Sequence, residues 1–204
     1  MRGEAMGKIC TRLKAEGVDM RKLSALDFFA REGDWQTVVY AREVGVMEAW
    51  EISPEFLPGL QRNLPGATVR IVDSYAYGPK TTDRFDFVVL DNPQAIFGPE
   101  GRYCEHFEAL PVVLRLLRPG AFLVFNLNWA PFNFEANKEW QRRRAEFYGT
   151  VDTSSLSLER FMLPYYTRYF EVKGFEIINC FVQPRNNDYL AYAVFRLQPK
   201  ELLP

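Results

Sequence analysis

Short apolar runs of strand length alternate along the chain with segments of helical periodicity. The apolar runs lie at residues 24–30, 46–53, 67–73, 85–91 and 121–127, and turn-forming residues separate them. The fourth run is almost entirely apolar, as expected for a strand that is buried on both faces. Because strands alternate with helical segments, the pattern predicts βαβ units and a mostly parallel sheet with helices on both faces.

The intervening segments place apolar residues at helical spacing. We expect helices at residues 4–22, 33–44, 53–66, 107–117 and 158–173. Asp34 is a candidate N-cap of the second helix, Pro58 and Gly59 should break the third, and Pro111 should start the regular part of the fourth. The sequence RPG at 118–120 should end the fourth helix before the last of the five strands.

The last part of the chain changes the pattern. Residues 175–183 and 189–197 are two strand-like runs joined by the turn-type sequence PRNND, which is typical of a β-hairpin. The expected fold class is therefore a Rossmann-like, doubly wound α/β fold, with a mostly parallel seven-stranded sheet that ends in an antiparallel hairpin. No break in composition divides residues 1–204, so we expect a single domain with a leading helix in 1–23 and an insertion over the site at 128–157.

Composition limits the classes of protein that fit this pattern. The 204 residues are 48% hydrophobic and 15% aromatic, which excludes a disordered chain. Lys and Arg total 25 against 26 Asp and Glu, so the net charge of −1 provides no general field to attract nucleic acid or an anionic membrane. Three distant cysteines argue against a disulfide framework or a zinc site, and no segment has the pattern of a signal peptide or a membrane span. We expect a cytoplasmic protein with no membrane partner and no metal.

Candidate ligand-binding residues lie where the predicted strands end. A doubly wound sheet binds its ligand at the carboxyl ends of its strands. Four of the five parallel strands carry an acid or an amide in or near that end, namely Asp27, Glu51, Asp73 and Asp91 with Asn92. A carboxylate at the end of the second strand can accept hydrogen bonds from both ribose hydroxyls of a nucleoside, and Asp73 could accept one from an adenine amine. Taken singly, each acid could equally be a solvated residue or a helix cap.

With these residues in place, the sequence resembles the class I S-adenosylmethionine-dependent methyltransferases. The resembling segments are LDFFAREG, AWEISPEF, VRIVDSYAY, FDFVVLDNPQ and LLRPGAFLVFN, followed by the closing hairpin, and they cover about residues 24–198. The resemblance implies a methyltransferase with S-adenosylmethionine as its cofactor. The cofactor-binding residues that it implies are Asp27, Phe29, Ala30, Arg31, Gly33, Glu51, Ile52, Asp73, Ser74 and Asp91.

The first of these segments departs from the family pattern. Members usually have a GxGxG-like loop, because the backbone passes against the cofactor with positive φ angles that a Cβ atom disfavours. Here Arg31 occupies a glycine position and Gly33 is retained. Arg31 could block the pocket, or it could turn outward and bind the methionine carboxylate of the cofactor through its guanidinium.

The fourth segment contains the candidate catalytic residues Asp91, Asn92 and Pro93. The sequence DNPQ partly resembles the [DNS]PP[YFW] signature of enzymes that methylate amide or exocyclic nitrogens, although Gln94 does not match. Phe97 is a candidate replacement for the aromatic residue that stacks on a planar substrate. The acceptor is left open among a nucleic-acid base, a protein and a small molecule, and it would enter over residues 92–103 and 128–165. Asn92 and Pro93 could also be an ordinary turn.

Two other functions are compatible with the sequence. A catalytically silent methyltransferase-like domain could serve as a binding or scaffold subunit, which Arg31 and the incomplete DNPQ motif would favour. Ser157, Tyr169 and Lys173 imitate the catalytic pattern of a short-chain, NAD(P)-dependent oxidoreductase, but the glycine fingerprint that such a cofactor needs is missing. The sequence leaves the oligomeric state open.

Several polar residues outside these motifs are expected at the surface. His106 could be a general base, but its place at a helix start beside Glu105 favours a surface or capping residue. Arg142, Arg143 and Arg144 could contact phosphate, and in a chain of nearly zero net charge they favour a solvated helix face.

Overall fold

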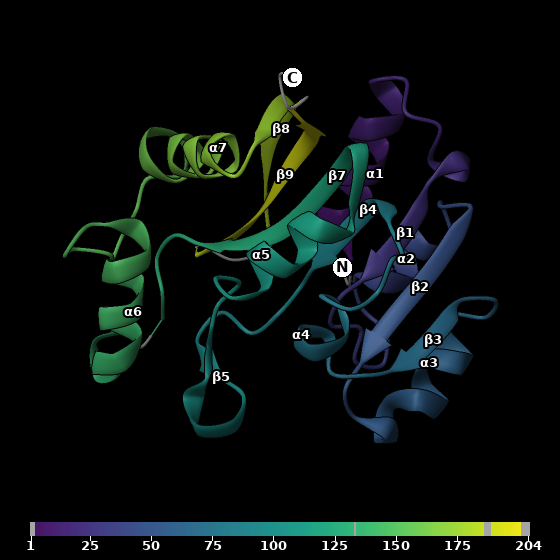
Figure 1. The fold of residues 1–204 in the computed structure, drawn as a ribbon, viewed down its shortest axis with the longest axis horizontal. Helices are drawn as coiled ribbons and strands as arrows, with labels where there is room; N and C mark the ends of the chain where they lie inside the picture. Colours follow the sequence, from purple (N-terminus) through teal and green to yellow (C-terminus); the bar gives the residue numbers. More distant parts are fainter. Residues whose placement is uncertain (1–2, 133, 186–188, 201–204) are drawn as a thin grey trace.

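The chain folds around one seven-stranded sheet with a smaller two-stranded sheet beside it. The computed structural model describes residues 3–132, 134–185 and 189–200. The strand order of the large sheet is β3-β2-β1-β4-β7-β9-β8 (Figure 1). Its strands are β1 (Ser24–Asp27), β2 (Val46–Glu51), β3 (Thr68–Ile71), β4 (Phe85–Leu90), β7 (Leu117–Asn128), β8 (Phe175–Pro184) and β9 (Leu190–Pro199).

The pairing of these strands confirms the expected fold class. Strands β1 to β4 and β7 pair in parallel, whereas β9 lies antiparallel between β7 and β8. The order reverses at β1 and β4, so the carboxyl ends of these two strands flank the crevice where a doubly wound fold binds its ligand. The turn expected at 184–188 lies partly outside the described residues.

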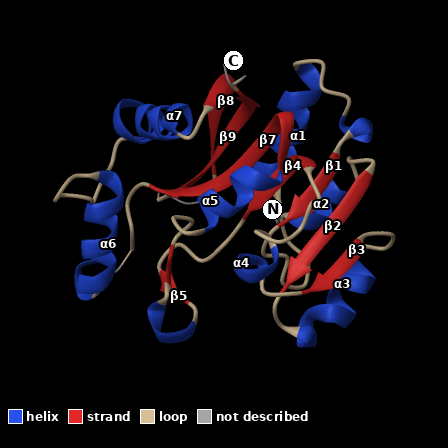
Figure 2. Ribbon diagram, in the orientation of Figure 1, coloured by secondary structure: helices blue, strands red, loops and turns tan. Residues whose placement is uncertain are grey.

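Helices cover both faces of the large sheet (Figure 2). They are α1 (Glu4–Ala15), α2 (Thr37–Ala41), α3 (Leu57–Asn63), α4 (Ser74–Tyr77), α5 (Ala109–Val113), α6 (Lys138–Tyr148) and α7 (Leu163–Val172). Short helical turns η1 (Met20–Lys22), η2 (Pro54–Phe56), η3 (Pro99–Gly101), η4 (Leu114–Leu116), η5 (Phe134–Ala136) and η6 (Leu158–Met162) join or extend them. The segment 128–157 thus contains α6, which lies at the left of the molecule below α7 in Figure 1.

Alternate residues of the central strands pack into two separate hydrophobic cores. On β4, Phe87 and Val89 face the core formed with α1, whereas Val88 and Leu90 face the core formed with α5 and α7. Successive side chains of a strand point to opposite faces, so a strand covered on both faces must be apolar at every position. This explains the apolar sequence Phe87–Leu90 that identified β4, whereas Asp86 near its start pairs with Arg118.

The structure corrects several element boundaries. Helix α2 begins at Thr37 with Gln36 as its N-cap, so the expected cap at Asp34 is wrong. Pro58 does not break the third helix, because it lies in the first turn of α3, where its missing N–H has no helical partner. Strand β7 begins at Leu117, before the RPG sequence that was expected to precede it.

The sequence pattern missed three short elements. The segment directly after β3 contains α4, and the segment after β4 folds back on itself as a hairpin of β5 (Ile96–Phe97) and β6 (Tyr103–Cys104). These elements are too short to produce a readable period. The hairpin matters most, because it forms one wall of the candidate site.

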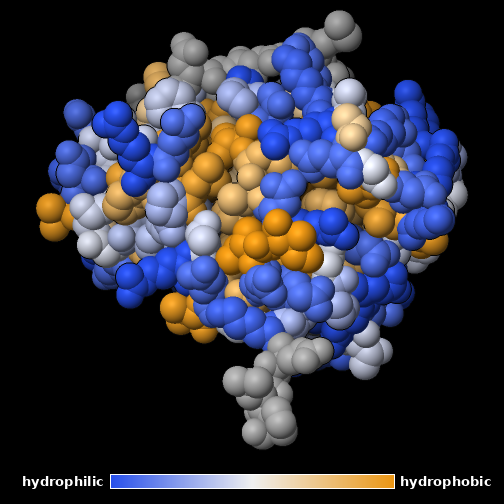
Figure 3. All heavy atoms as spheres, turned by 90° about the horizontal axis from the view of Figure 1, so that it is seen from above, coloured by the Kyte–Doolittle hydropathy of each residue, from blue (hydrophilic) through white to orange (hydrophobic). Residues whose placement is uncertain are grey.

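A membrane-spanning helix must be both long and apolar. None of the described helices is long and apolar enough to cross a membrane. Seen from above, hydrophilic side chains surround apolar atoms exposed near the centre of the face (Figure 3).

Candidate functional site

A cavity of about 810 Å³ opens at the carboxyl ends of the parallel strands. Its size lies within the range of about 300–1,000 Å³ that is usual for small-molecule and cofactor sites. Every site residue expected from the sequence lines this cavity: Asp27, Phe29, Ala30, Arg31, Gly33, Glu51, Ile52, Asp73, Ser74, Asp91, Asn92 and Pro93. The structure therefore brings together residues that are separated by up to 66 positions in the chain.

The loop after β1 has a glycine-type backbone even where glycine is absent. Arg31 has a φ of 48° and Gly33 a φ of 66°. The Ala30 N–H donates to the carbonyl of Trp50 on β2 at 2.9 Å, and the Gly33 N–H closes a turn onto the carbonyl of Ala30 at 2.8 Å. A Cβ atom at Gly33 would lie 2.8 Å from the Leu64 side chain, which would have to shift, so packing as well as φ favours glycine here.

The Arg31 side chain turns away from the loop instead of filling it. Arg31 is exposed, and its guanidinium carbon lies 5.6 Å from the centre of the Phe56 ring. Phe56 belongs to η2 and does not line the cavity. Arg31 itself lines the cavity, so its exposed side chain lies at the rim.

Glu51 and Asp73 are held in fixed orientations by backbone N–H groups. Glu51 is 8% exposed and accepts from the N–H of Arg31 at 2.7 Å and from that of Ser53 at 2.8 Å. Asp73 caps α4 by accepting from the N–H of Tyr75 at 2.9 Å. Because a carboxylate oxygen has two lone pairs, these bonds orient both groups and leave acceptor capacity for a ligand.

Two neighbours complete this side of the cavity. The Ser74 hydroxyl donates to the carbonyl of Phe28 at 2.8 Å, which ties α4 to the loop after β1. Ile52 is 66% exposed although it is apolar, and it lines the cavity directly after Glu51. An exposed isoleucine beside an oriented carboxylate offers an apolar face and a polar edge to a planar base.

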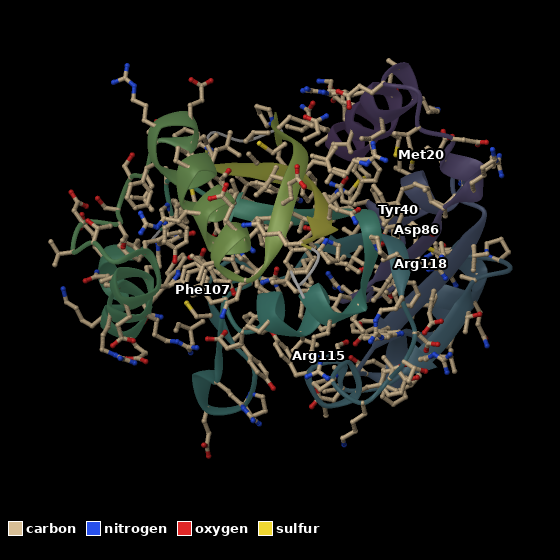
Figure 4. The ribbon with its side chains drawn as sticks, turned by 45° about the horizontal axis from the view of Figure 1, so that its top comes forward. Met20, Tyr40, Asp86, Phe107, Arg115 and Arg118 are labelled. Atoms are coloured by element: carbon tan, nitrogen blue, oxygen red, sulfur yellow. The ribbon has the colours of Figure 1, made fainter. Side chains whose placement is uncertain are left out.

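Asp27 lies beneath the loop and is almost fully buried. It accepts from the Thr37 hydroxyl at 2.5 Å, the Tyr40 hydroxyl at 2.9 Å and the Phe29 N–H at 3.1 Å (Tyr40 is labelled in Figure 4). Burial raises the pKa of Asp27 to about 6, and these three hydrogen bonds oppose the rise because they stabilise the carboxylate.

Asp91 is the centre of a polar cluster on the cavity floor. Its carboxylate accepts from Asn126 Nδ2 at 2.6 Å, from Arg185 Nη1 at 2.8 Å and from the Tyr192 hydroxyl at 2.9 Å. Sequence reasoning missed Asn126, Arg185 and Tyr192 as site residues. The one signal for them was a polar amide inside the apolar run of β7.

The segment after Asp91 forms another part of the cavity wall. Asn92 is 4% exposed, and its side-chain N–H groups donate to the carbonyls of Pro93 and Glu105. Phe97 also lines the cavity, with its ring centre 6.4 Å from that of Phe29. The amide of Asn92 thus anchors the β5–β6 hairpin and places Phe97 at the site.

Solved structures resemble this chain over nearly its whole length. The magnesium protoporphyrin IX methyltransferase ChlM from Synechocystis PCC 6803, solved with S-adenosylhomocysteine, has a TM-score of 0.60 and 12% identity and covers 95% of this chain and 82% of its own. The N-methyltransferase NodS from Bradyrhizobium japonicum WM9, solved with the same ligand, has a TM-score of 0.58 and 13% identity. The match covers 95% of this chain and 86% of NodS. Trm5b from Pyrococcus abyssi has a TM-score of 0.54 and 12% identity and covers 95% of this chain, which spans about half (49%) of that protein.

The chain has the fold of the class I S-adenosylmethionine-dependent methyltransferases. Comparison with models of known protein families and with curated protein sequences gave no match. Identities of 12% and 13% concern the fold alone, so the chemistry must be argued from this chain's own residues.

A buried ion pair joins helix α6 to the rest of this methyltransferase fold. Glu105 and Arg144 are fully buried and form a salt bridge, and the Trp140 indole N–H donates to the same Glu105 oxygen at 2.8 Å. Glu105 has a φ of 48°, and Arg144 also donates to the carbonyl of Asn128 at 3.0 Å. The expectation of a solvated helix face is therefore wrong for Arg144, whose charge is paired in the interior.

His106 is also buried, contrary to the expectation of a surface or capping residue. Its Nε2 shares a hydrogen bond with the Tyr166 hydroxyl, which in turn lies 2.9 Å from the Tyr148 hydroxyl. Burial and the nearby positive charge of Arg144 lower the pKa of His106 to about 3. His106 does not line the cavity, so it cannot reach a ligand there as a general base.

The residues of the dehydrogenase-like pattern lie elsewhere in the methyltransferase fold. Ser157 caps η6, and Tyr169 and Lys173 lie along and just after α7; none of the three lines the cavity. Within the described ranges, no group of three or more His, Cys, Asp or Glu side chains is arranged to hold a metal ion.

Proposed function

We propose that this chain is an S-adenosylmethionine-dependent methyltransferase. The observation that carries the proposal is the backbone of Arg31, whose φ of 48° keeps a glycine-type conformation where the class I pattern has a glycine. An arginine in this region of φ is strained, and such strain tends to persist where a ligand site requires it. The carboxylates at the neighbouring strand ends line the same cavity, so the residues present fit the cofactor.

The nucleoside part of the cofactor would bind beside β2 and β3. Glu51, already oriented by two backbone N–H groups, would accept from the ribose hydroxyls. Asp73 would accept from the adenine amine next to Ser74, and Ile52 would pack on the base.

The amino-acid part would bind along the loop after β1. Phe29, Ala30 and Gly33 would pass against it through their backbone, and the Arg31 guanidinium at the rim would bind the carboxylate. Asp27, beneath the loop, would attract the ammonium group.

The transfer itself would depend on positioning more than on acid–base catalysis. When bound, the cofactor supplies a methyl group that is activated by a sulfonium. Asn92 and Pro93 on the opposite wall would align the acceptor for in-line attack, which can supply much of the rate. If the acceptor is a nitrogen, the Asp91 carboxylate would stabilise the positive charge that develops on it.

A catalytically silent, methyltransferase-like binding domain is the second candidate. Both oxygens of Asp91 already accept from protein donors, and the side-chain N–H groups of Asn92 are turned into the protein. This arrangement favours a structural role for the DNPQ segment.

Calorimetric titration with S-adenosylhomocysteine tests the proposal. We expect the wild-type protein to bind it and Glu51→Ala to weaken binding by about 1.5–3 kcal/mol, the range for a hydrogen bond to a charged group. Glu55→Ala is the matched control, because Glu55 is exposed on η2 and does not line the cavity. Absence of binding by the wild-type protein would overturn the enzyme proposal, and an unchanged affinity in Glu51→Ala would move the ribose site elsewhere.

A further inference from the structure

Charge is distributed unevenly around the cavity. Among the described residues, the carboxylates that line it all come from the first half of the chain: Asp27, Asp34, Glu51, Asp73 and Asp91. The lining residues after Asp91 include two arginines, Arg102 and Arg185, and no described carboxylate. The described lining residues of the β5–β6 and β8–β9 hairpins therefore carry positive charge, whereas the wall proposed for the cofactor is acidic.

The two arginines differ in what they contact. Arg185 Nη1 donates to the Asp91 carboxylate at 2.8 Å and to the side-chain carbonyl of Asn126 at 2.7 Å. The charge of Arg185 is therefore balanced by a carboxylate. Arg102 is exposed and has no carboxylate partner among the described residues; its guanidinium carbon lies 5.6 Å from the centre of the Tyr103 ring. Its backbone is fixed, because its carbonyl accepts from Arg143 Nη1 at 3.1 Å. Arg102 therefore presents, from an anchored backbone, a positive charge that pairs with no carboxylate in the described part of the chain.

Aromatic rings adjoin this charge on the same wall. Tyr103 stacks on Tyr75 with ring centres 3.8 Å apart and planes within 4°. The ring centre of Phe97 lies 5.6 Å from that of Tyr103, and both residues line the cavity. A stacked, rigid group of rings is a good surface for another planar ring, and a guanidinium is well matched to a carboxylate or phosphate.

From this arrangement, we infer that the methyl acceptor is a small planar ring that carries an anionic group. The ring would lie against Phe97 and Tyr103, and the anion would bind Arg102. That the bound molecule accepts a methyl group rests on the proposed function. The binding site for a planar anion rests only on Arg102 and the aromatic rings. The cavity volume of about 810 Å³ favours a small molecule, because the cofactor also has to be accommodated there.

The test uses two probes of the same shape and different charge. We propose to titrate 2-naphthoate and its neutral isostere 2-naphthamide by NMR, with and without saturating S-adenosylhomocysteine. We expect 2-naphthoate to bind at least tenfold more tightly, since only its carboxylate can form charge-assisted hydrogen bonds with a guanidinium. Arg102→Gln should reduce this ratio to about one to two without changing the affinity for the amide.

Two variants separate the charge from the ring surface. Arg115→Gln removes an exposed arginine on η4 that does not line the cavity (Figure 4), and it should leave the tenfold ratio intact. Phe97→Ala should weaken both probes by a similar factor and preserve their ratio. Because Arg102 and Arg115 are exposed, loss of folding is not expected, and circular dichroism checks it.

Each result counts for or against the inference. The inference is overturned if the two probes bind equally or if neither binds. It is also overturned if Arg102→Gln and Arg115→Gln reduce the affinity for 2-naphthoate equally. If S-adenosylhomocysteine fails to bind while the Arg102-dependent ratio persists, the proposed function fails and the anion site stands. If S-adenosylhomocysteine binds but the ratio is absent, the acceptor inference fails alone.

Discussion

Arg31 has a backbone conformation that a glycine would adopt more easily. An L-residue in the left-handed region costs about 1–2 kcal/mol, whereas a glycine there loses about 0.5–1 kcal/mol through greater freedom of the unfolded chain. If Arg31 has a function, its side chain must offset the difference in backbone free energy between arginine and glycine at this position. Its place at the rim of the cavity, over Phe56, is consistent with binding the carboxylate of a cofactor.

Arg31→Gly should separate the backbone of this residue from its charge. We expect the free energy of unfolding, measured with urea, to rise by up to about 1 kcal/mol as strain is relieved. The affinity for S-adenosylhomocysteine should fall about tenfold, as for loss of a charge-assisted hydrogen bond. The affinity for 5′-methylthioadenosine, which lacks the carboxylate, should not change. A similar loss for both ligands would show that Arg31 acts by shaping the loop.

At the scale of elements, helix α6 is attached to the acceptor wall through Glu105. The side chain of Glu105 pairs with Arg144 and Trp140 of α6, while its carbonyl accepts from Asn92. A buried pair contributes little net stability compared with apolar residues, but loss of one partner leaves an isolated buried charge. The pair therefore fixes the position of α6 relative to the DNPQ segment more than it stabilises the fold.

Arg144→Met should show this asymmetry. We expect it to lower the free energy of unfolding by about 3–5 kcal/mol, because the Glu105 carboxylate is left buried and unpaired. Adding Glu105→Gln should recover most of the loss. Arg142→Met is the control on the same helix: Arg142 pairs with Glu139 and Glu146 at the surface, so the cost should be below about 1 kcal/mol. Equal costs for the two single variants would show that the buried pair has no special role.

At the scale of the whole molecule, the sequence predicts those strands and site residues that are determined by a pattern of neighbouring residues. Each strand-end acid follows directly on an apolar run, so Glu51, Asp73 and Asp91 were found and the sheet end was placed. Arg185 reaches Asp91 only because β9 inserts between β7 and β8, a pairing between distant segments that no local pattern encodes. Arg144 lies in a charged run that reads as exposed, since its partner Glu105 is 39 positions earlier in a conformation that is rare for its type.

The pH dependence of global stability should reveal two buried groups of opposite effect. His106, whose pKa is lowered from 6.5 to about 3, is protonated first in the unfolded chain, so stability is lost as pH falls below 6.5. Asp27, whose pKa is raised from 3.8 to about 6, is protonated first in the folded chain, so stability is gained as pH falls from 6 to 4. At about 1.4 kcal/mol per pH unit, each contributes about 2–3 kcal/mol over this window, and the two nearly cancel.

Asp27→Asn removes one side of this balance. We expect its unfolding free energy, measured by urea titration between pH 6 and pH 4, to fall by about 2–3 kcal/mol more than that of the wild-type protein over the same interval. His106→Gln should change the slope in the opposite direction. The slope is the informative quantity, because either substitution can also shift stability equally at every pH. Curves for Asp27→Asn that run parallel to the wild-type curve would mean that Asp27 titrates normally and that water reaches its carboxylate beneath the loop more than its burial indicates.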